Sequence, residues 1–87
     1  MKVLIDPHTR SRMPARGISE EEIVDVLRSG TSAPASHGRL AKEKIYPFGT
    51  AWRGRIHPQK KVRVVYVVEE GLMVTVTAIS YYGEWED

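Results

Sequence analysis

The sequence contains no cysteine, and this absence excludes disulfide bonds, thiol catalysis and zinc sites built on cysteine. Histidine is also scarce: the chain has three, and their positions, His8, His37 and His57, lack the spacing of metal ligands. The longest apolar runs lie near residues 64–68 and 74–79, far short of a bilayer span, and the N-terminus has no signal-peptide pattern. We therefore expect a cytoplasmic protein that uses no metal or cofactor and makes no membrane contact.

The chain is also short. Its 87 residues, 41% of them hydrophobic and 28% charged, have the composition of one soluble domain with room for one core. The sequence therefore predicts a single domain over residues 1–87. A core of this size buries a modest share of the unfolded chain's surface, so a homodimer or a tightly bound partner is a reasonable expectation.

The net charge is low, at +2, but the charges are unevenly distributed along the chain. Between residues 39 and 63 there are eight basic residues and one acidic residue, Glu43, so this segment has a net charge of +7 and the rest of the chain −5. The basic residues are Arg39, Lys42, Lys44, Arg53, Arg55, Lys60, Lys61 and Arg63. Such segregation favours a surface that binds a polyanion, although a solvated basic face without a partner explains the same pattern.

The N-terminal segment predicts a short strand followed by a helix. Residues 2–5 are apolar enough for a strand, and Asp6 and Pro7 then mark a helix start, with Asp6 at the N-cap and Pro7 at the first helical position. Gly17 closes this helix as a left-handed cap, and Ile18 after it folds back on the helix.

Three residues that suit phosphate chemistry recur every fourth position in this helix, at His8, Arg12 and Arg16. The spacing places them on one face, where they can act on one object. Pro14 removes the hydrogen bond to the carbonyl of Arg10, so we expect a kinked or irregular second half. The position of Arg16 depends on that irregularity.

A second helix begins at Ser19, which forms a capping box with Glu22 and is followed by three glutamates in the first turn. The helix ends at Ser29 and Gly30, and a polar loop follows over Thr31–Gly38. The predicted buried stripe of the helix comprises Ile23, Val26 and Leu27.

After this loop the pattern alternates as in a β-strand over Leu40–Phe48. One face of this strand carries Leu40, Lys42, Lys44 and Tyr46. Trp52 and Ile56 share one side of a further half-buried strand, and Pro58–Lys61 is predicted as a turn.

Two segments rich in β-branched residues, Val62–Glu69 and Leu72–Ile79, are expected at the centre of the sheet, joined by a hairpin turn at Glu70–Gly71. The polar residues inside these strands are Arg63, Thr75 and Thr77. Either they face solvent on a one-sided sheet, or Arg63 and Thr77 lie on the face that meets a substrate. Together the elements predict an α+β fold in which two N-terminal helices pack on an antiparallel sheet of three to four strands.

The N-terminal motif resembles that of a small prokaryotic family, domain of unknown function 4258. The motif comprises His8, Arg12, Met13, and the run Arg16–Ser19 before the acidic helix start. The later residues Val62–Val65, Thr77 and Trp85 agree with the pattern of that family, and the resemblance covers nearly the whole chain. It implies a RelE-like fold, similar to compact endoribonuclease toxins of the RelE and BrnT kind. Because such toxins are often encoded beside an antitoxin, an antitoxin protein is an expected partner.

Cleavage of RNA without a metal needs a group that transfers a proton and cations that stabilise the charged phosphate. His8 is the candidate for proton transfer, because histidine, with a reference pKa of about 6.5, holds both protonation states near neutral pH. Arg12 and Arg63 are the candidates for a catalytic phosphate clamp. The residues expected to bind the substrate are Arg16, Lys42, Lys44, Tyr46, Arg53, Arg55 and Thr77, with Tyr46 or Trp52 stacking a base.

Alternatives remain open at these residues. His8 equally suits a helix residue whose ring packs on the sheet, and Tyr46 and Trp52 fall on faces that alternation buries. Trp85 is expected to pack across the edge of the sheet. The predicted function is a toxin-like, metal-independent endoribonuclease that acts on RNA; the alternative is a non-catalytic module that binds nucleic acid or a protein partner through the basic sheet face.

Overall fold

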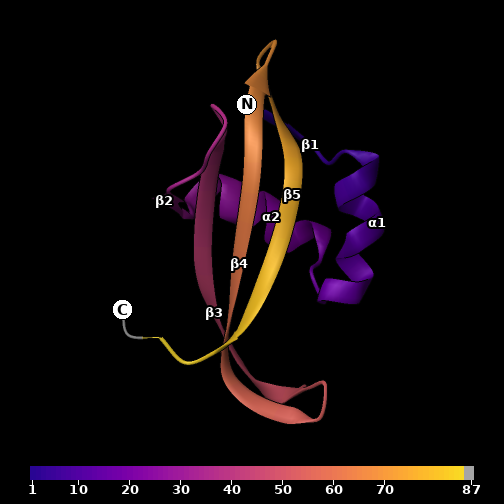
Figure 1. The fold of residues 1–87 in the computed structure, drawn as a ribbon, viewed down its shortest axis with the longest axis vertical. Helices are drawn as coiled ribbons and strands as arrows, with labels where there is room; N and C mark the ends of the chain where they lie inside the picture. Colours follow the sequence, from indigo (N-terminus) through magenta and orange to yellow (C-terminus); the bar gives the residue numbers. More distant parts are fainter. Residues whose placement is uncertain (86–87) are drawn as a thin grey trace.

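The computed structural model describes residues 1–85. Its elements are β1 (Lys2–Leu4), α1 (Pro7–Arg16), α2 (Glu20–Ser29), β2 (Thr31–Ala33), β3 (Leu40–Trp52), β4 (Arg55–Glu69) and β5 (Leu72–Gly83). The strands form one sheet in the order β1-β5-β4-β3-β2, in which β1 runs parallel to β5 and the other neighbours are antiparallel (Figure 1). The α+β class with two N-terminal helices is confirmed, but the described sheet is mixed and has five strands rather than three or four.

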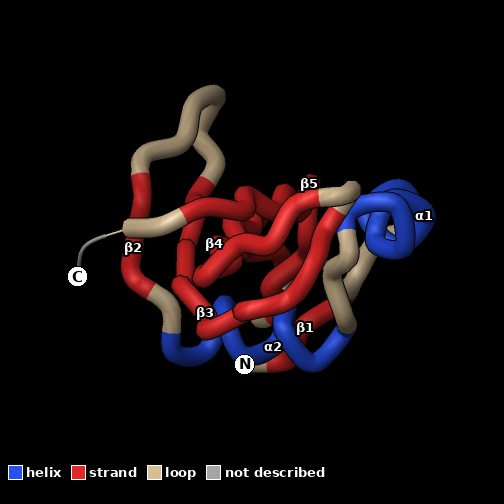
Figure 2. The backbone as a smooth tube through the Cα atoms, turned by 90° about the horizontal axis from the view of Figure 1, so that it is seen from below, coloured by secondary structure: helices blue, strands red, loops and turns tan. Residues whose placement is uncertain are grey.

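The two helices take different places against the sheet. α2 packs across β3 and β4 on one side, which we call the helix face, while α1 flanks β5 (Figure 2). We call the opposite side of the sheet the open face. The core lies between α2 and the sheet, and its buried residues include Ile23, Val26, Leu27, Val62, Val64 and Tyr66. Within the described residues, no helix is both long and apolar enough to cross a membrane.

The predicted start and end of α1 are confirmed. Asp6 is the N-cap, and Pro7 occupies the first helical position. Gly17 is the left-handed cap with a φ of 65°, and the N–H of Ile18 donates to the carbonyl of Met13 at 3.0 Å. These local signals fix the helix because they satisfy backbone groups that lack partners at its ends.

The predicted capping box of α2 is also confirmed. The N–H of Glu22 donates to Ser19 Oγ at 3.1 Å, and the N–H of Ser19 donates to Glu22 Oε1 at 2.9 Å. The predicted stripe of α2 is buried against the sheet. The sequence therefore determined both helices through their ends and through the spacing of apolar residues.

The turn predicted at Pro58–Lys61 is wrong. β4 runs through this segment, and the chain reverses instead at Arg53 and Gly54, which have φ values of 52° and 83°. Pro58 is tolerated inside the strand because the register of β3 and β4 shifts opposite it, where the ladder needs no N–H from proline. Ile56, predicted to be half-buried, is 76% exposed near this turn.

Two further differences concern the ends of the sheet. Part of the predicted loop, Thr31–Ala33, forms the edge strand β2, which pairs with β3. β3 and β5 also continue beyond their predicted ends, to Trp52 and Gly83. The sequence did not predict β2 because this edge strand consists of small and polar residues. Its side chains do not alternate between core and solvent, so the sequence shows no strand periodicity there.

Thr75 is buried rather than solvent-facing, because it binds the N-cap of α1. Its hydroxyl accepts from the N–H of Asp6 at 3.1 Å and donates to Asp6 Oδ1 at 2.8 Å. Burial opposes ionisation of Asp6, but hydrogen bonds from Thr9 and Thr75 outweigh burial and lower the pKa of this carboxyl. The contact ties the start of α1 to β5.

Replacement of Gly17 by alanine is expected to lower the free energy of unfolding by about 2 kcal/mol. A Cβ at Gly17 would lie 2.6 Å from Tyr82 Oη and 2.8 Å from the ring of Trp52, in addition to the cost of the left-handed backbone. Gly71→Ala is the matched control: it has a φ of 76° and no atom within 4 Å of the new Cβ. We expect the control to lose about 1 kcal/mol in urea unfolding; equal losses would show that the aromatic contact does not matter.

Candidate functional site

α1 presents the predicted stripe along one flank. His8 and Arg12 are exposed and lie one helical turn apart. The helix continues through Pro14 to Arg16 as one element, so its second half is helical rather than an irregular turn. A proline in a short helix removes one hydrogen bond, here to the carbonyl of Arg10, and packing against the sheet offsets that loss. Arg16 therefore shares the flank of His8 and Arg12.

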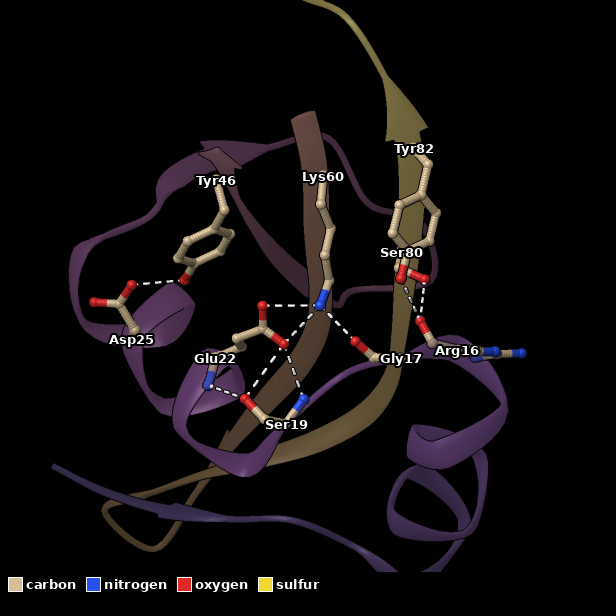
Figure 3. Close-up of polar contacts among 9 residues, drawn as sticks. All are labelled: Arg16, Gly17, Ser19, Glu22, Asp25, Tyr46, Lys60, Ser80 and Tyr82. Atoms are coloured by element: carbon tan, nitrogen blue, oxygen red, sulfur yellow. Dashed lines mark hydrogen bonds and ion pairs between the residues drawn. The ribbon is translucent and has the colours of Figure 1, made fainter. Parts of the chain in front are cut away.

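Arg16 joins this stripe to the edge of β5. Its guanidinium Nη1 donates to the carbonyl of Ala78 at 2.7 Å and to Thr77 Oγ1 at 3.3 Å. The carbonyl of Arg16 accepts hydrogen bonds from Ser80 Oγ at 2.5 Å and Tyr82 Oη at 3.2 Å (Figure 3). We define the α1–β5 surface as His8, Arg12, Arg16 and Thr77.

Arg63 is close to this surface but points away from it. It lies on the open face, and Thr77, which pairs with Val65, is its diagonal neighbour across the ladder of β4 and β5. The Arg63 guanidinium donates to Glu43 Oε2 at 3.1 Å and to the carbonyl of Pro34. Both partners lie on the side of β4 that is remote from β5.

This orientation corrects the prediction that Arg12 and Arg63 form one phosphate clamp beside His8. α1 flanks β5, whereas the side chain of Arg63 is held toward β3 and the segment after β2. The structure brings Arg16 and Thr77 together instead. The spacing of residues in the sequence predicts which helix residues share a flank. It does not predict that the side chain of Arg63 points toward Glu43 and Pro34, because these partners lie far from Arg63 in the sequence.

Three residues predicted to hold or stack RNA face α2 instead. Lys42 Nζ donates to the carbonyl of Leu27 at 2.8 Å, near the C-terminus of α2. Lys44 Nζ at 2.8 Å and Tyr46 Oη at 2.6 Å both donate to Asp25 Oδ2. Alternation placed these residues on one face, as predicted, but that face is covered by an acidic helix and is not a surface for RNA.

These contacts also shift two pKa values. Hydrogen bonds from Lys44, Tyr46 and Ser29 lower the pKa of the Asp25 carboxyl to about 2. Burial, together with the hydrogen bond to the Asp25 carboxylate, raises the pKa of the Tyr46 phenol. Asp25 is therefore ionised and Tyr46 protonated at neutral pH, and the pair holds α2 to β3.

Of the three residues in the hairpin of β3 and β4 that were predicted to contact RNA, two pack against the fold and one is exposed. Trp52 stacks on Tyr82 with ring centroids 4.7 Å apart, which agrees with the alternative that places it in the packed interior. Arg53 donates through Nη2 to the carbonyl of Ala15 at 2.9 Å, at the end of α1. Arg55 is exposed. Two of the three expected contacts thus pack the hairpin against the rest of the fold.

Lys60 is a polar core residue that the sequence interpretation missed. Its side chain is 7% exposed, and Nζ lies 2.8 Å from both carboxylate oxygens of Glu22 and also donates to the carbonyl of Gly17 (Figure 3). Residues two apart in a strand share a face, so Lys60 would have been predicted to lie on the buried side with Val62. The turn wrongly predicted at Pro58–Lys61 prevented this prediction. Three acceptors satisfy the three N–H groups of the ammonium, which makes Lys60 an anchor for the connection between the helices.

Ion pairs within the fold involve three of the eight basic residues between positions 39 and 63. Lys44 and Lys60 face acidic residues of α2, and Arg63 faces Glu43 of β3. The basic strand segment therefore packs on an acidic helix. Among the residues that the sequence predicted to bind or cleave RNA, those of the α1–β5 surface combine an exposed histidine, His8, with two arginines, Arg12 and Arg16. Among residues 1–85, no three His, Asp or Glu side chains are grouped as ligands for a metal ion.

The fold and this surface define a small α+β protein with one helix across a five-stranded mixed sheet and a second, basic helix along its β5 side. Comparison of the chain with protein-family models, with curated proteins and with solved structures finds no match in any of the three. The resemblance to domain of unknown function 4258 and to RelE-like toxins therefore stays a prediction.

Proposed function

We propose that the protein binds RNA through its phosphates at the α1–β5 surface and cleaves it without a metal ion. The observation that carries this proposal is the double hydrogen bond from Arg16 to Thr77 and Ala78, which fixes the basic flank of α1 against the sheet edge. Fixed cations stabilise a phosphodiester in the transition state better than flexible ones, because their orientation costs nothing during the reaction.

The donors of this surface suit an anionic oxygen. An arginine has five N–H donors, and the two hydrogen bonds of Arg16 leave donors for a phosphate. The Thr77 hydroxyl accepts from Arg16, so its own proton can be donated to the same ligand. Arg12 is exposed one turn from Arg16 and supplies a second guanidinium.

The proposed reaction uses the RNA itself as the nucleophile. Neutral His8 takes the proton of a 2′-hydroxyl, the 2′-oxygen forms a bond to the adjacent phosphorus, and the bond from phosphorus to the 5′-oxygen breaks. The departing 5′-oxygen takes a proton from water, and the hydroxide that remains takes the proton held by His8, which restores the neutral imidazole. His8 suits this role because its side chain is exposed in the first turn of α1, one turn from Arg12.

Arg12→Ala is expected to weaken binding of a single-stranded RNA oligonucleotide about tenfold, as for the loss of one charge-assisted hydrogen bond. It should also reduce the slope of log affinity against log salt by about 0.7, the value for one phosphate contact on a single strand. Fluorescence anisotropy at several salt concentrations measures both quantities.

Arg28→Ala is the matched control, because Arg28 is an exposed arginine in the last turn of α2. It carries the same charge as Arg12 but lies outside the α1–β5 surface. Equal losses for Arg12→Ala and Arg28→Ala would show that net charge, and not this surface, governs binding. A wild-type protein that does not bind RNA would refute the proposal altogether.

A further inference from the structure

The open face carries a row of side chains next to the α1–β5 surface. α2 lies on the other side of the sheet (Figure 2), and the side chains of this row are half-buried except for Tyr81, which is exposed. Neighbours across β4 and β5 in this row are Lys61 and Tyr81, Arg63 and Ile79, and Val65 and Thr77. The row thus begins at Thr77, within the proposed RNA site, and ends at an aromatic residue.

Tyr81 differs from the other aromatic residues in its exposure. Of the seven aromatic side chains, all within the described residues, Tyr81 is 43% exposed and the others are buried or half-buried. Its neighbour in sequence, Tyr82, points to the opposite side, where it stacks on Trp52 and binds the end of α1. Alternation along β5 therefore leaves Tyr81 on the open face, opposite Lys61.

We infer that Tyr81 stacks a base of single-stranded RNA whose phosphate is held at the α1–β5 surface. The inference rests on the proposed function and specifies its substrate as single-stranded RNA of more than one nucleotide. Thr77 and Tyr81 are four residues apart on one strand, which is about 13 Å. A single nucleotide reaches one of these places, whereas an oligonucleotide lying along β5 reaches both.

The charges and the exposed ring favour RNA over a protein partner on this face. Lys61 and Arg63 are the positive charges of the row, and Glu43 pairs with Arg63, so Lys61 supplies the positive charge that favours a phosphate. Lys61 stands directly across from Tyr81, and its Nζ lies 4.8 Å from the ring centroid of Trp85. A contact with a ring face leaves the N–H groups of the ammonium able to donate to the phosphate next to a stacked base. A double-stranded RNA keeps its bases stacked on one another and presents no base to Tyr81.

The test compares Tyr81→Phe and Tyr81→Leu in binding to an unstructured RNA of several nucleotides, a duplex of the same length and a nucleoside monophosphate. Tyr81→Phe should retain the affinity for the single strand, because the ring remains. Tyr81→Leu should lose about tenfold, the energy of one stacked base, and should leave the weak binding of the monophosphate unchanged. Ile56→Ala, at an exposed apolar residue in the hairpin, is the control and should bind as wild type.

Two outcomes overturn the inference and leave the proposed function intact. In the first, Tyr81→Leu binds the single strand as wild type while Arg12→Ala remains weakened. In the second, the wild type binds the duplex as tightly as the single strand. A third outcome assigns the face to another occupant: a wild-type dimer in sedimentation that Tyr81→Leu dissociates would show that a second copy of the chain covers it.

Discussion

Replacement of His8 by alanine is expected to lower the rate of RNA cleavage by a factor of about 10² to 10⁴, the usual contribution of a general acid or base. RNA affinity should change little, because the arginines of the α1–β5 surface supply the phosphate contacts. The side chain of His8 is exposed on α1, so its truncation should leave the fold intact. Single-turnover cleavage of a labelled oligonucleotide, with anisotropy on the same RNA, separates the two effects.

His37→Ala is the matched control for this experiment. His37 is also an exposed histidine, but it lies in the loop between β2 and β3, outside the α1–β5 surface. Its removal should leave cleavage unchanged. If the wild type binds RNA and does not cut it, the enzymatic part of the proposal fails and the protein is a binding module, which was the alternative that the sequence left open.

Lys60→Met is expected to lower the free energy of unfolding by about 3–5 kcal/mol, because it removes one partner of a buried ion pair. The variant leaves the Glu22 carboxylate and the carbonyl of Gly17 without their common donor. For a domain of this size, such a loss corresponds to a fall in melting temperature of more than about 10 °C. Urea unfolding followed by circular dichroism measures the change.

Lys61→Met is the natural comparison, since the two lysines are adjacent in sequence and face opposite sides of β4. Lys61 is half-buried on the open face, where its Nζ lies 4.8 Å from the ring centroid of Trp85. We expect the Lys61 variant to lose less than about 1 kcal/mol. Similar losses for the two variants would contradict the anchoring role of Lys60.

A double variant tests the reason for the loss. Adding Glu22→Gln to Lys60→Met removes the carboxylate charge that has lost its lysine partner. The glutamine can still complete the capping box with Ser19. The double variant should therefore recover about 1 kcal/mol relative to Lys60→Met. A double variant less stable than the single one would show that Glu22 is stabilised by other groups.

The anchor at Lys60 also supports the proposed site. Lys60 holds the carbonyl of Gly17, and Ser80 and Tyr82 hold the carbonyl of Arg16, so the end of α1 is fixed to two strands. The guanidinium of Arg16 extends from this fixed backbone to the edge of β5. Loosening the connection between the helices should therefore weaken RNA binding as well as stability.

Local signals in the sequence predicted the helices well. Asp6 and Pro7 start α1, Gly17 ends it, and the capping box starts α2, because each satisfies backbone groups within a few residues. The same reasoning failed at Pro58, which suggested a turn. A register shift in the partner strand, which no local pattern reveals, lets β4 accept the proline.

The sequence by itself determined the α+β class, the ends of both helices, the flank shared by His8, Arg12 and Arg16, and the alternation of the long strands. These properties depend on residues close together in the chain. Tertiary structure alone decided which face of the sheet α2 covers. That choice pairs Lys44 and Lys60 with acidic residues of α2. The packing of the other elements directs Arg63 toward Glu43 and away from α1, and joins Arg16 to Thr77 across 61 positions of sequence. The reason is physical: a charged side chain is drawn to the nearest opposite charge or carbonyl, and only the packed fold decides which one is nearest.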